Sequence, residues 1–342
     1  MDEHCIMGRF MRDESKHVPL TAREPDLTLV GDKLKSTWRG HLGRKDLPAQ
    51  ADALRKLVGG KKIVVAPGVF SPAVAKLAEK SGFKALYFSG AGFSSLLALP
   101  DLGITTLSEV AQATHQITAT VTAPLVVDVD TGFGEAVNVA RTVKEMRAAG
   151  AAAIHIEDQV LPKRCGHLEG KELIDVDEML KKLVSAKEAA GKELMIIART
   201  DARAVEGIDG AVDRAITYSR AGPDMIFPEA LESREEFVEF RRKVRLPLMA
   251  NMTEFGKTPY MTAREFEDMG YNLVIFPVTA FRAMMKTVKS TFAALKSEGT
   301  QKRILNSLMT RREFYNLIDY YRFEKADVNA IEAARRLQGR AK

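Results

Sequence analysis

The chain has 342 residues, of which 46% are hydrophobic and 28% are charged. This is the composition of an ordinary folded protein, and it disfavours disorder, a collagen-like repeat and a coiled coil. It carries 51 Lys and Arg against 45 Asp and Glu, a net charge of +6 that is compatible with a nucleic acid, an anionic substrate or no binding role.

Residues 1–50 are polar and are interrupted by Pro19, Pro25 and Pro48, so we expect them to form an N-terminal extension. Their first twenty residues lack the apolar core of a secretory signal. No run of about 18 apolar residues occurs in the chain, so we expect no membrane span. The two cysteines, Cys5 and Cys165, are too few for a disulfide framework, which favours a reducing, cytoplasmic location.

From residue 61 onward, short β-branched runs alternate with longer amphipathic segments. Strands are predicted at residues 62–66, 85–89, 124–129, 152–157, 194–199, 225–228, 247–251 and 272–277. Helices are predicted at residues 50–58, 138–149, 176–190, 210–221, 234–244 and 263–269. The tail has helical spacing at 310–321 and 329–337.

Eight strands, each followed by a helix, predict an α/β protein with a (β/α)8 barrel over residues 51–300. The nearly continuous apolar character of the strands fits a parallel sheet that is buried on both faces. An open doubly wound sheet needs a G-x-G-x-x-G turn after the first strand, and residues 66–70 do not provide one. Residues 301–342 form a predicted helical tail. Residues 283–342 hold 13 basic and 6 acidic residues, so the charge excess belongs mainly to this end of the chain.

The active site of such a barrel lies at the carboxyl ends of its strands. Here the predicted strand ends carry polar or ionisable side chains, whereas the opposite ends carry no such set. These residues are Ser89, Asp128, Asp130, His155, Glu157, Arg199, Glu229, Asn251 and Thr253. We therefore expect a functional site at this mouth.

The D-x-D pair is the strongest sign of a metal in the sequence. Asp128 and Asp130 are two residues apart, so a strand directs both carboxylates to one face. The two repel each other unless a cation lies beside them. Oxygen ligands without His or Cys suit Mg²⁺, with Mn²⁺ as the alternative. Glu157 is placed to hold metal-bound water. The competing interpretation is a solvated turn.

Lys163, Arg164 and His167 flank Cys165 in the segment K-R-C-G-H. Nearby positive charge favours a thiolate, so we expect Cys165 to donate or accept a proton near neutral pH. The competing interpretation is an inert buried cysteine. Glycines in the same loop would let it move as a lid. His155, between apolar neighbours, is expected to be a core histidine.

Several motifs together resemble the isocitrate lyase/phosphoenolpyruvate mutase superfamily. They are D-V-D-T-G-F-G at 128–134, H-I-E-D-Q at 155–159, K-R-C-G-H at 163–167 and N-M-T-E-F-G-K-T-P at 251–259. The resemblance covers residues 60–325, and it is nearest to the 2-methylisocitrate lyases of that superfamily. It implies a barrel whose C-terminal helices are swapped between the subunits of a homotetramer.

The resemblance also assigns roles to residues. It places Mg²⁺ on Asp128 and Asp130, with Asp101 and Glu157 in the outer coordination sphere. It gives catalytic roles to Cys165, Lys163, Glu157 and Tyr87. It assigns substrate contacts to Ser89, Gly90, Ala91, Cys165, Gly166, Arg199, Glu229, Asn251, Met252, Thr253, Arg282 and Arg311.

The implied reaction is the cleavage of a small tricarboxylate, 2-methylisocitrate, into pyruvate and succinate, as in propionate catabolism. Cys165 would donate the proton that quenches the succinate-derived enediolate. Tyr87 and a metal-bound hydroxide stay open as the base. Phe227 and Ile275 would surround the extra methyl group of the substrate. The alternatives are isocitrate, both substrates, dimethylmalate or oxaloacetate. No motif supports a nucleic acid or a membrane as a partner.

Overall fold

The computed structural model describes residues 48–337 and confirms the predicted α/β class. Eight strands form one parallel sheet in the order β6-β5-β4-β3-β2-β1-β8-β7. They are β1 (Val64–Val69), β2 (Leu86–Phe88), β3 (Leu125–Asp128), β4 (Ala153–Glu157), β5 (Met195–Thr200), β6 (Met225–Pro228), β7 (Met249–Asn251) and β8 (Leu273–Phe276). Most predicted strands agree within two residues, but β1 extends to Val69. Of the extension predicted at residues 1–50, residues 1–47 lie outside the described residues, and residues 48–50 belong to the first described helix, which starts at Pro48.

The sheet curls into a nearly closed barrel. β6 and β7 meet through an isolated parallel bridge between Ile226 and Leu248, and the Ile226 amide donates to the Pro247 carbonyl at 3.0 Å. Every other neighbouring pair of strands is joined by a regular parallel ladder. The carboxyl ends of all eight strands therefore converge at one mouth.

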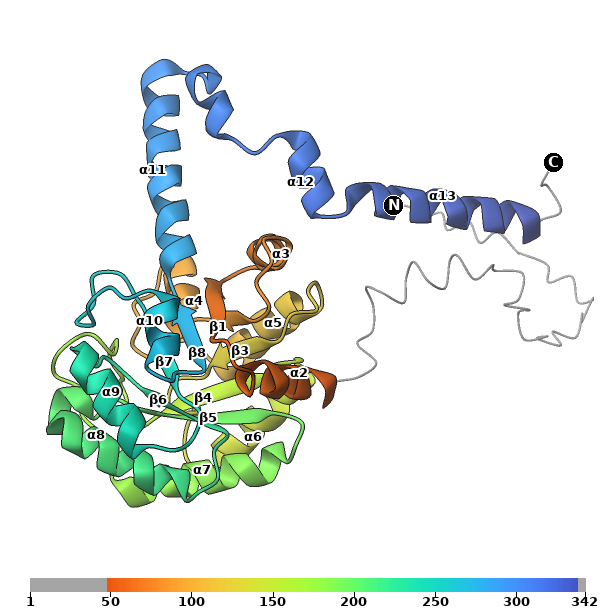
Figure 1. Cartoon of the computed structure of the whole chain (residues 1–342). Coiled ribbons are helices and arrows are strands. Elements are labelled where there is room, and N and C mark those ends of the chain that lie inside the picture. The colour runs from red at the N-terminus through yellow and green to blue at the C-terminus, as the bar shows by residue number, and fades with distance from the viewer. Residues whose placement is uncertain (1–47, 338–342) are drawn as a thin grey trace, which may run out of the picture.

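Helices surround the barrel (Figure 1). They are α2 (Pro48–Val58), α3 (Pro72–Lys80), α4 (Gly90–Leu96), α5 (Leu107–Thr118), α6 (Ala136–Ala148), α7 (Val176–Ala190), α8 (Arg203–Ser219), α9 (Arg234–Lys243), α10 (Ala263–Asp268) and α11 (Thr279–Glu298). Capping boxes start α5 at Thr106 and α10 at Thr262, and each box satisfies amides at the helix start. The predicted helix at 210–221 begins earlier, at Arg203, and contains a kink at Gly207.

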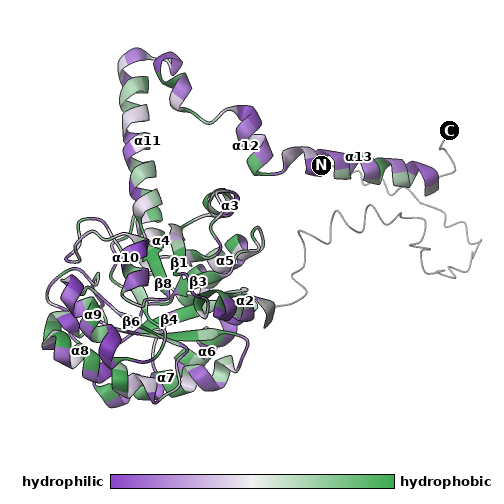
Figure 2. Ribbon diagram, viewed as in Figure 1, coloured by the Kyte–Doolittle hydropathy of each residue, from purple (hydrophilic) through white to green (hydrophobic). Residues whose placement is uncertain are grey.

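The core has two layers, because alternate strand residues point inward and outward. Inward residues such as Val126, Ile197 and Met249 fill the barrel, and Leu54 from α2 joins the same buried cluster, so α2 plugs the amino end. Outward residues pack against the helices. Figure 2 shows hydrophobic strands inside a shell of helices with hydrophilic outer faces.

The C-terminal segment leaves the barrel. α11 projects outward and is followed by the 3₁₀ helix η2 (Lys302–Ser307), α12 (Arg311–Leu317) and α13 (Tyr320–Leu337) (Figure 1). The predicted single helix at 310–321 is wrong, because Asp319 has a left-handed φ of +57° and separates α12 from α13. Aspartate tolerates this conformation better than most residues. Lys76 on α3 forms an ion pair with Asp319.

Across residues 48–337, the structure contains no helix that combines the length and the apolar character needed to cross a membrane.

Candidate active site

A cleft of about 400 Å³ opens at the carboxyl ends of the strands. Most of the residues predicted for the site line it. They are Tyr87, Ser89, Ala91, Asp101, Asp128, Lys163, Cys165, Gly166, Arg199, Glu229, Asn251, Thr253 and Arg282. The polar strand ends identified in the sequence thus meet in one place.

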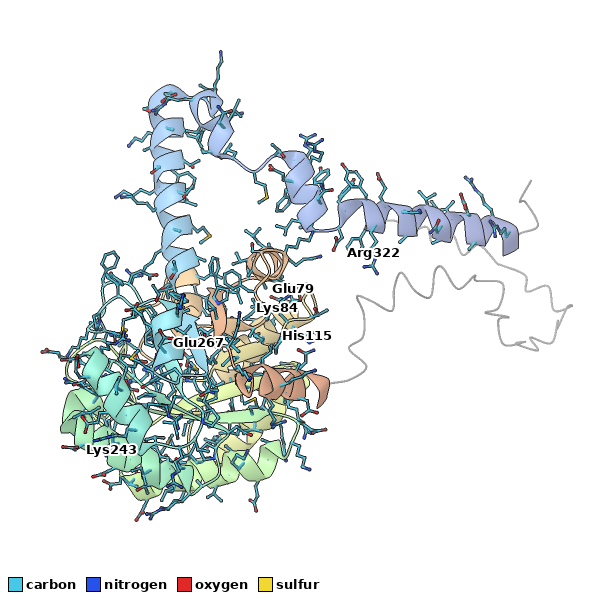
Figure 3. The ribbon with its side chains drawn as sticks, in the orientation of Figure 1. Glu79, Lys84, His115, Lys243, Glu267 and Arg322 are labelled. Carbon is cyan, nitrogen blue, oxygen red and sulfur yellow. The ribbon has the colours of Figure 1, made fainter. Side chains whose placement is uncertain are left out.

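A larger hollow of about 900 Å³ lies at the opposite end of the barrel, beside α2. Its polar lining is dominated by exposed lysines such as Lys61, Lys62 and Lys84. Figure 3 shows Glu79 and Lys84, two of its lining residues, near α3. Convergent buried polar groups, not volume, mark a functional site. We therefore assign the site to the smaller cleft.

Three predicted residues lie directly behind the lining of the cleft. The Gly90 amide donates to Oδ2 of Asp128 at 3.0 Å. Oδ1 of Asp130 lies 2.9 Å from Nζ of Lys163, and Oε2 of Glu157 lies 3.1 Å from a terminal nitrogen of Arg199.

Met252 and Arg311 are not among the described residues that line the cleft. Met252 is buried, and its sulfur accepts the Met261 amide at 3.3 Å. Arg311 is exposed at the start of α12. The predicted contacts of both residues with substrate stay predictions.

The S-G-A-G segment after β2, residues 89–92, places a backbone amide beside the D-x-D pair. Oγ of Ser89 caps α4 by accepting the Gly92 amide at 3.2 Å, which leaves the Gly90 amide directed at Asp128. A Cβ on residue 90 would lie 3.0 Å from Oδ2 of Asp128 and 3.3 Å from Oδ1 of Asp130. The two carboxylates therefore approach a common point, and residue 90 has to be small.

The pKa values of Asp128 and Asp130 are shifted in opposite directions, because different charges surround the two carboxylates. Burial opposes the ionisation of Asp128, but His155, Lys163 and Arg199 outweigh it and lower the pKa to about 2. Burial raises the pKa of Asp130 to about 6, because the charge of Asp128 counteracts the opposing effect of Lys163.

The residues at this point fit a hard divalent cation. Oε1 of Glu157 is buried and has no hydrogen-bond partner within residues 48–337, whereas Oδ1 of Asp130 and Oε2 of Glu157 lie beside the cations Lys163 and Arg199. In the same part of the chain, no three His, Cys, Asp or Glu side chains form a ready metal cage. Mg²⁺ commonly binds through one or two carboxylates and keeps several waters, so this sparse oxygen set suits it.

The loop that carries Cys165 spans residues 160–172 and contributes Lys163, Cys165, Gly166 and His167 to the lining of the cleft. We call it the Cys165 loop, and we call this position closed. Gln159 and Leu173 form an antiparallel bridge at its base. Gly166 packs against Glu229 so closely that a Cβ there would lie 2.7 Å from Cδ of Glu229. Lys163, with 4% of its side chain exposed, forms ion pairs with Asp101 and Asp130.

His167 is a second anchor of the Cys165 loop, whereas the sequence indicated only a positive charge beside the cysteine. Its Nδ1 accepts the Lys257 amide at 3.0 Å, which leaves the proton on Nε2 to face Oε1 of Glu229 at 3.1 Å. Asn251 donates a further hydrogen bond to Oε1 of Glu229 at 3.0 Å. The position of His167 within K-R-C-G-H was the signal that could have revealed it.

The expectation of a favoured thiolate at Cys165 is wrong. Burial raises the pKa of this thiol, and the charges of Glu229 and Asp101 add to the effect. The neighbouring cations are engaged elsewhere, since Lys163 pairs with Asp101 and Asp130. Cys165 is therefore a protonated thiol at neutral pH, which suits a proton donor.

Tyr87 and His155 form a buried pair beneath the D-x-D site. The Tyr87 hydroxyl lies 2.8 Å from Nε2 of His155 and 3.4 Å from Oδ2 of Asp128. Burial, together with Asp128, raises the pKa of Tyr87 well above its usual range. Burial lowers the pKa of His155 to about 4, so this histidine is neutral. His155 is a core residue, as expected, but it also orients Tyr87.

Arg199 is held by two carboxylates. Its guanidinium donates to both oxygens of Asp201, at 2.9 and 3.1 Å, and pairs with Glu157. Phe227 lies beneath it, with Cζ of Arg199 5.2 Å from the ring centroid. Phe227 lines the cleft, but Ile275 is not among the described lining residues. Apolar lining that the sequence analysis missed comes from Pro277, Val278 and Phe281.

The sequence of this chain is similar to those of known enzymes. The family described as phosphoenolpyruvate phosphomutase matches residues 54–296. The 2-methylisocitrate lyase of Aeropyrum pernix is 55% identical over 299 residues, which cover 87% of this chain and 97% of that protein. The 2-methylisocitrate lyase of Bacillus subtilis is 48% identical over 81% of this chain and 92% of its own length.

Two solved structures are also similar to this chain in sequence and fold. A crystal structure of 2,3-dimethylmalate lyase is 35% identical, with a TM-score of 0.78, and the match covers 82% of this chain and 95% of that one. A phosphonopyruvate hydrolase in complex with oxalate and Mg²⁺ is 30% identical, with a TM-score of 0.74, over 82% of this chain and 98% of that one.

Proposed function

The chain belongs to the phosphoenolpyruvate mutase/isocitrate lyase superfamily, and from this premise we propose that it is a 2-methylisocitrate lyase. The reaction cleaves one carbon–carbon bond of 2-methylisocitrate and yields pyruvate and succinate. The observation that carries the proposal is the position of the Cys165 thiol, which lines the same cleft as Asp128 and Arg199.

The substrate is a small tricarboxylate, and cationic and amide groups in the cleft suit its carboxylates. Arg199 and Arg282 supply charge-assisted hydrogen bonds. Asn251 and Thr253 supply neutral donors from the end of β7. We assign substrate binding to these residues together with Ser89, Gly90, Ala91, Gly166 and Glu229.

A metal ion completes the charge balance of the cleft. Carboxylates in and behind its lining outnumber the cations there, which disfavours an anionic substrate unless a further cation is bound. We propose that Asp128 and Asp130 hold Mg²⁺, with Asp101 and Glu157 in the outer coordination sphere and Mn²⁺ as a substitute. When bound, Mg²⁺ stabilises the negative charge that develops on the oxo-acid product.

Cys165 supplies the proton in the proposed mechanism. The substrate hydroxyl loses its proton to solvent, its oxygen becomes the keto oxygen of pyruvate, and the carbon–carbon bond breaks. The electron pair of that bond passes to the succinate-derived enediolate, the thiol proton is transferred to the enediolate carbon, and solvent returns a proton to the thiolate. Lys163 pairs with Asp101 and Asp130, and Glu157 pairs with Arg199, so these two residues fix the positions of charged groups around the cleft. Tyr87 acts as a neutral hydrogen-bond donor in this scheme, because its raised pKa makes it a poor anionic base.

One comparison of substrates tests the function. With Mg²⁺ present, kcat/KM is measured for 2-methylisocitrate, isocitrate, dimethylmalate and oxaloacetate. We expect 2-methylisocitrate to be preferred over isocitrate by about 10- to 200-fold, since one methyl group is worth about 1–3 kcal/mol in an apolar pocket. If isocitrate, dimethylmalate or oxaloacetate had a higher kcat/KM than 2-methylisocitrate, that acid would be the preferred substrate and the proposed function would be wrong.

The C-terminal arm, residues 279–337, suits association with other copies. It carries exposed hydrophobic side chains, among them Phe292 at 65%, Tyr321 at 53% and Phe323 at 44%. Monomeric proteins rarely expose so many large apolar groups together. We propose a homotetramer with swapped C-terminal helices, in which Arg311 reaches the cleft of a neighbouring copy.

A cytoplasmic location also stays a proposal, based on the two cysteines.

A further inference from the structure

Lys171 is a buried lysine at the end of the Cys165 loop. Its side chain has no exposed surface, and Nζ donates to the Gly166 carbonyl and to Oδ1 of Asp201, the latter at 3.1 Å. Gly166 adjoins Cys165, so this ammonium group holds the loop directly behind the thiol. A polar lysine in a loop is ordinarily solvated, and its complete burial therefore needs a specific partner.

That partner is a carboxylate that also holds Arg199. Oδ1 of Asp201 accepts from both Lys171 and Arg199, and Oδ2 accepts from Nε of Arg199 at 2.9 Å. Burial opposes the charge on Asp201, but Arg199 and Lys171 outweigh it and lower the pKa to about 2. One ionised carboxylate thus connects the loop to a substrate-binding cation.

The carboxylate has a fixed position. The Asp201 amide donates to Oδ1 of Asp158 at 2.9 Å, and the Thr200 hydroxyl donates to Oδ2 of Asp158 at 2.7 Å. Tyr218 on α8 donates a third hydrogen bond to Asp158 at 2.9 Å. The end of β5 is therefore secured from behind, and Lys171 joins the loop to a rigid support.

We propose that Lys171 is a positioning residue that holds the Cys165 loop closed and connects its position to Arg199 through the carboxylate of Asp201. A buried ion pair contributes little net stability compared with an apolar pair of the same volume. Its benefit is geometric, because it fixes the positions of Cys165 and Arg199 relative to each other. The kinetic consequence rests on the proposed lyase function, whereas the closed position of the loop does not.

The test measures the accessibility of the thiol and the kinetics separately. All proteins carry Cys5→Ser, so that Cys165 is the one cysteine left in the chain. The rate of alkylation of Cys165 by N-ethylmaleimide is measured for the parent protein and for Lys171→Met, Lys171→Arg and Asp201→Asn. Lys187→Met is the matched control, because Nζ of Lys187 donates to Asp224 at 2.7 Å at the other end of the barrel.

We expect Lys171→Met and Asp201→Asn to be alkylated at least about tenfold faster, since local opening of the loop sets the rate. Lys187→Met should match the parent, and Lys171→Arg should restore slow alkylation because it keeps the charge and the donors. In turnover of 2-methylisocitrate, kcat of Lys171→Met should fall by about 10²-fold, the effect of misplacing a reacting group by about 1 Å.

Equal alkylation rates in Lys171→Met, Asp201→Asn and Lys187→Met would overturn the proposal. If Lys171→Met does not fold, the nearly isosteric Asp201→Asn decides the question alone. If the parent protein does not cleave 2-methylisocitrate, the proposed function fails, but the alkylation rates still test the position of the loop. The two failures are therefore distinguishable.

Discussion

Gly166 faces Glu229 at a distance that leaves no room for a side chain, since a Cβ there would lie 2.7 Å from Cδ of Glu229 and nearer still to Cγ. We expect Gly166→Ala to displace the Cys165 loop and to lower kcat/KM by about 10²-fold, with a small change in Tm. Kinetics and thermal unfolding of the purified variant measure the two effects.

Gly222→Ala is the control, because residue 222 has φ of +76° and open space around it. We expect Gly222→Ala to lower the free energy of unfolding by about 1–2 kcal/mol and to keep the activity of the parent protein. Full activity in Gly166→Ala would show that the contact with Glu229 does not set the position of the loop.

Cys165→Ser should retain the fold and lose the lyase activity. A serine hydroxyl is a far weaker acid than a thiol, so protonation of the enediolate slows, and we expect kcat to fall by about 10²–10⁴-fold, the usual contribution of general acid catalysis. Pyruvate release from 2-methylisocitrate is the assay, and Cys5→Ser is the control. Activity in Cys165→Ser close to that of the parent would remove Cys165 from the mechanism.

The reactivity of Cys165 should depend on pH in a way that an exposed thiol does not share. Burial raises its pKa, so the thiolate forms at higher pH than in a free cysteine. In the Cys5→Ser background, alkylation by iodoacetamide should still increase at pH values where N-acetylcysteine has reached its plateau. A plateau at lower pH than that of N-acetylcysteine would contradict the raised pKa.

Mg²⁺ should stabilise the protein through Asp128 and Asp130. A ligand at 100 times its Kd adds about 2.7 kcal/mol to the free energy of unfolding, so Tm should rise with Mg²⁺ and return to its starting value with EDTA. Asp128→Asn and Asp130→Asn should abolish the rise. Asp209→Asn, an exposed aspartate on α8, should keep it. An undiminished rise in both of the first two variants would place the metal elsewhere.

The exposed apolar face of the C-terminal arm should control assembly. Phe292→Glu and Phe323→Glu place a charge on this face, and we expect both to reduce the mass measured by size-exclusion chromatography with light scattering. Val137→Glu, at a residue 79% exposed on α6, is the control on the barrel surface and should leave the mass unchanged. An unchanged mass in all three variants would show that this face does not hold the subunits together, and a parent mass other than that of four chains would contradict the proposed homotetramer.

The barrel could be predicted from the sequence because each strand is a short apolar run, and burial on both faces leaves little choice of structure for such runs. The polar residues that follow the strands could be placed together for the same reason, since parallel strands end at one mouth. α3, α4 and α5 were not predicted individually. α4 is seven residues long and contains Gly90 and Gly92, two poor helix formers, which weakens its helical signal.

Other features depend on residues that are far apart in the chain. The thiolate expected at Cys165 followed from its neighbours in sequence, whereas burial in the folded cleft, together with the charges of Glu229 and Asp101 from distant parts of the chain, reverses the effect. Lys171 has the sequence features of a solvated loop lysine, and only the folded chain brings it to Asp201. The break at Asp319 follows no glycine or proline, so nothing local marked it.

The Cys165 loop is anchored at every fourth residue, by Lys163, His167 and Lys171, each to a different part of the chain. Surface loops generally tolerate insertions and deletions. Here a single added or removed residue between two anchors would leave one of them unable to reach its partner. The length of this loop is therefore as fixed as the identity of its cysteine, and a chain with a loop of different length would need a different way to close its cleft.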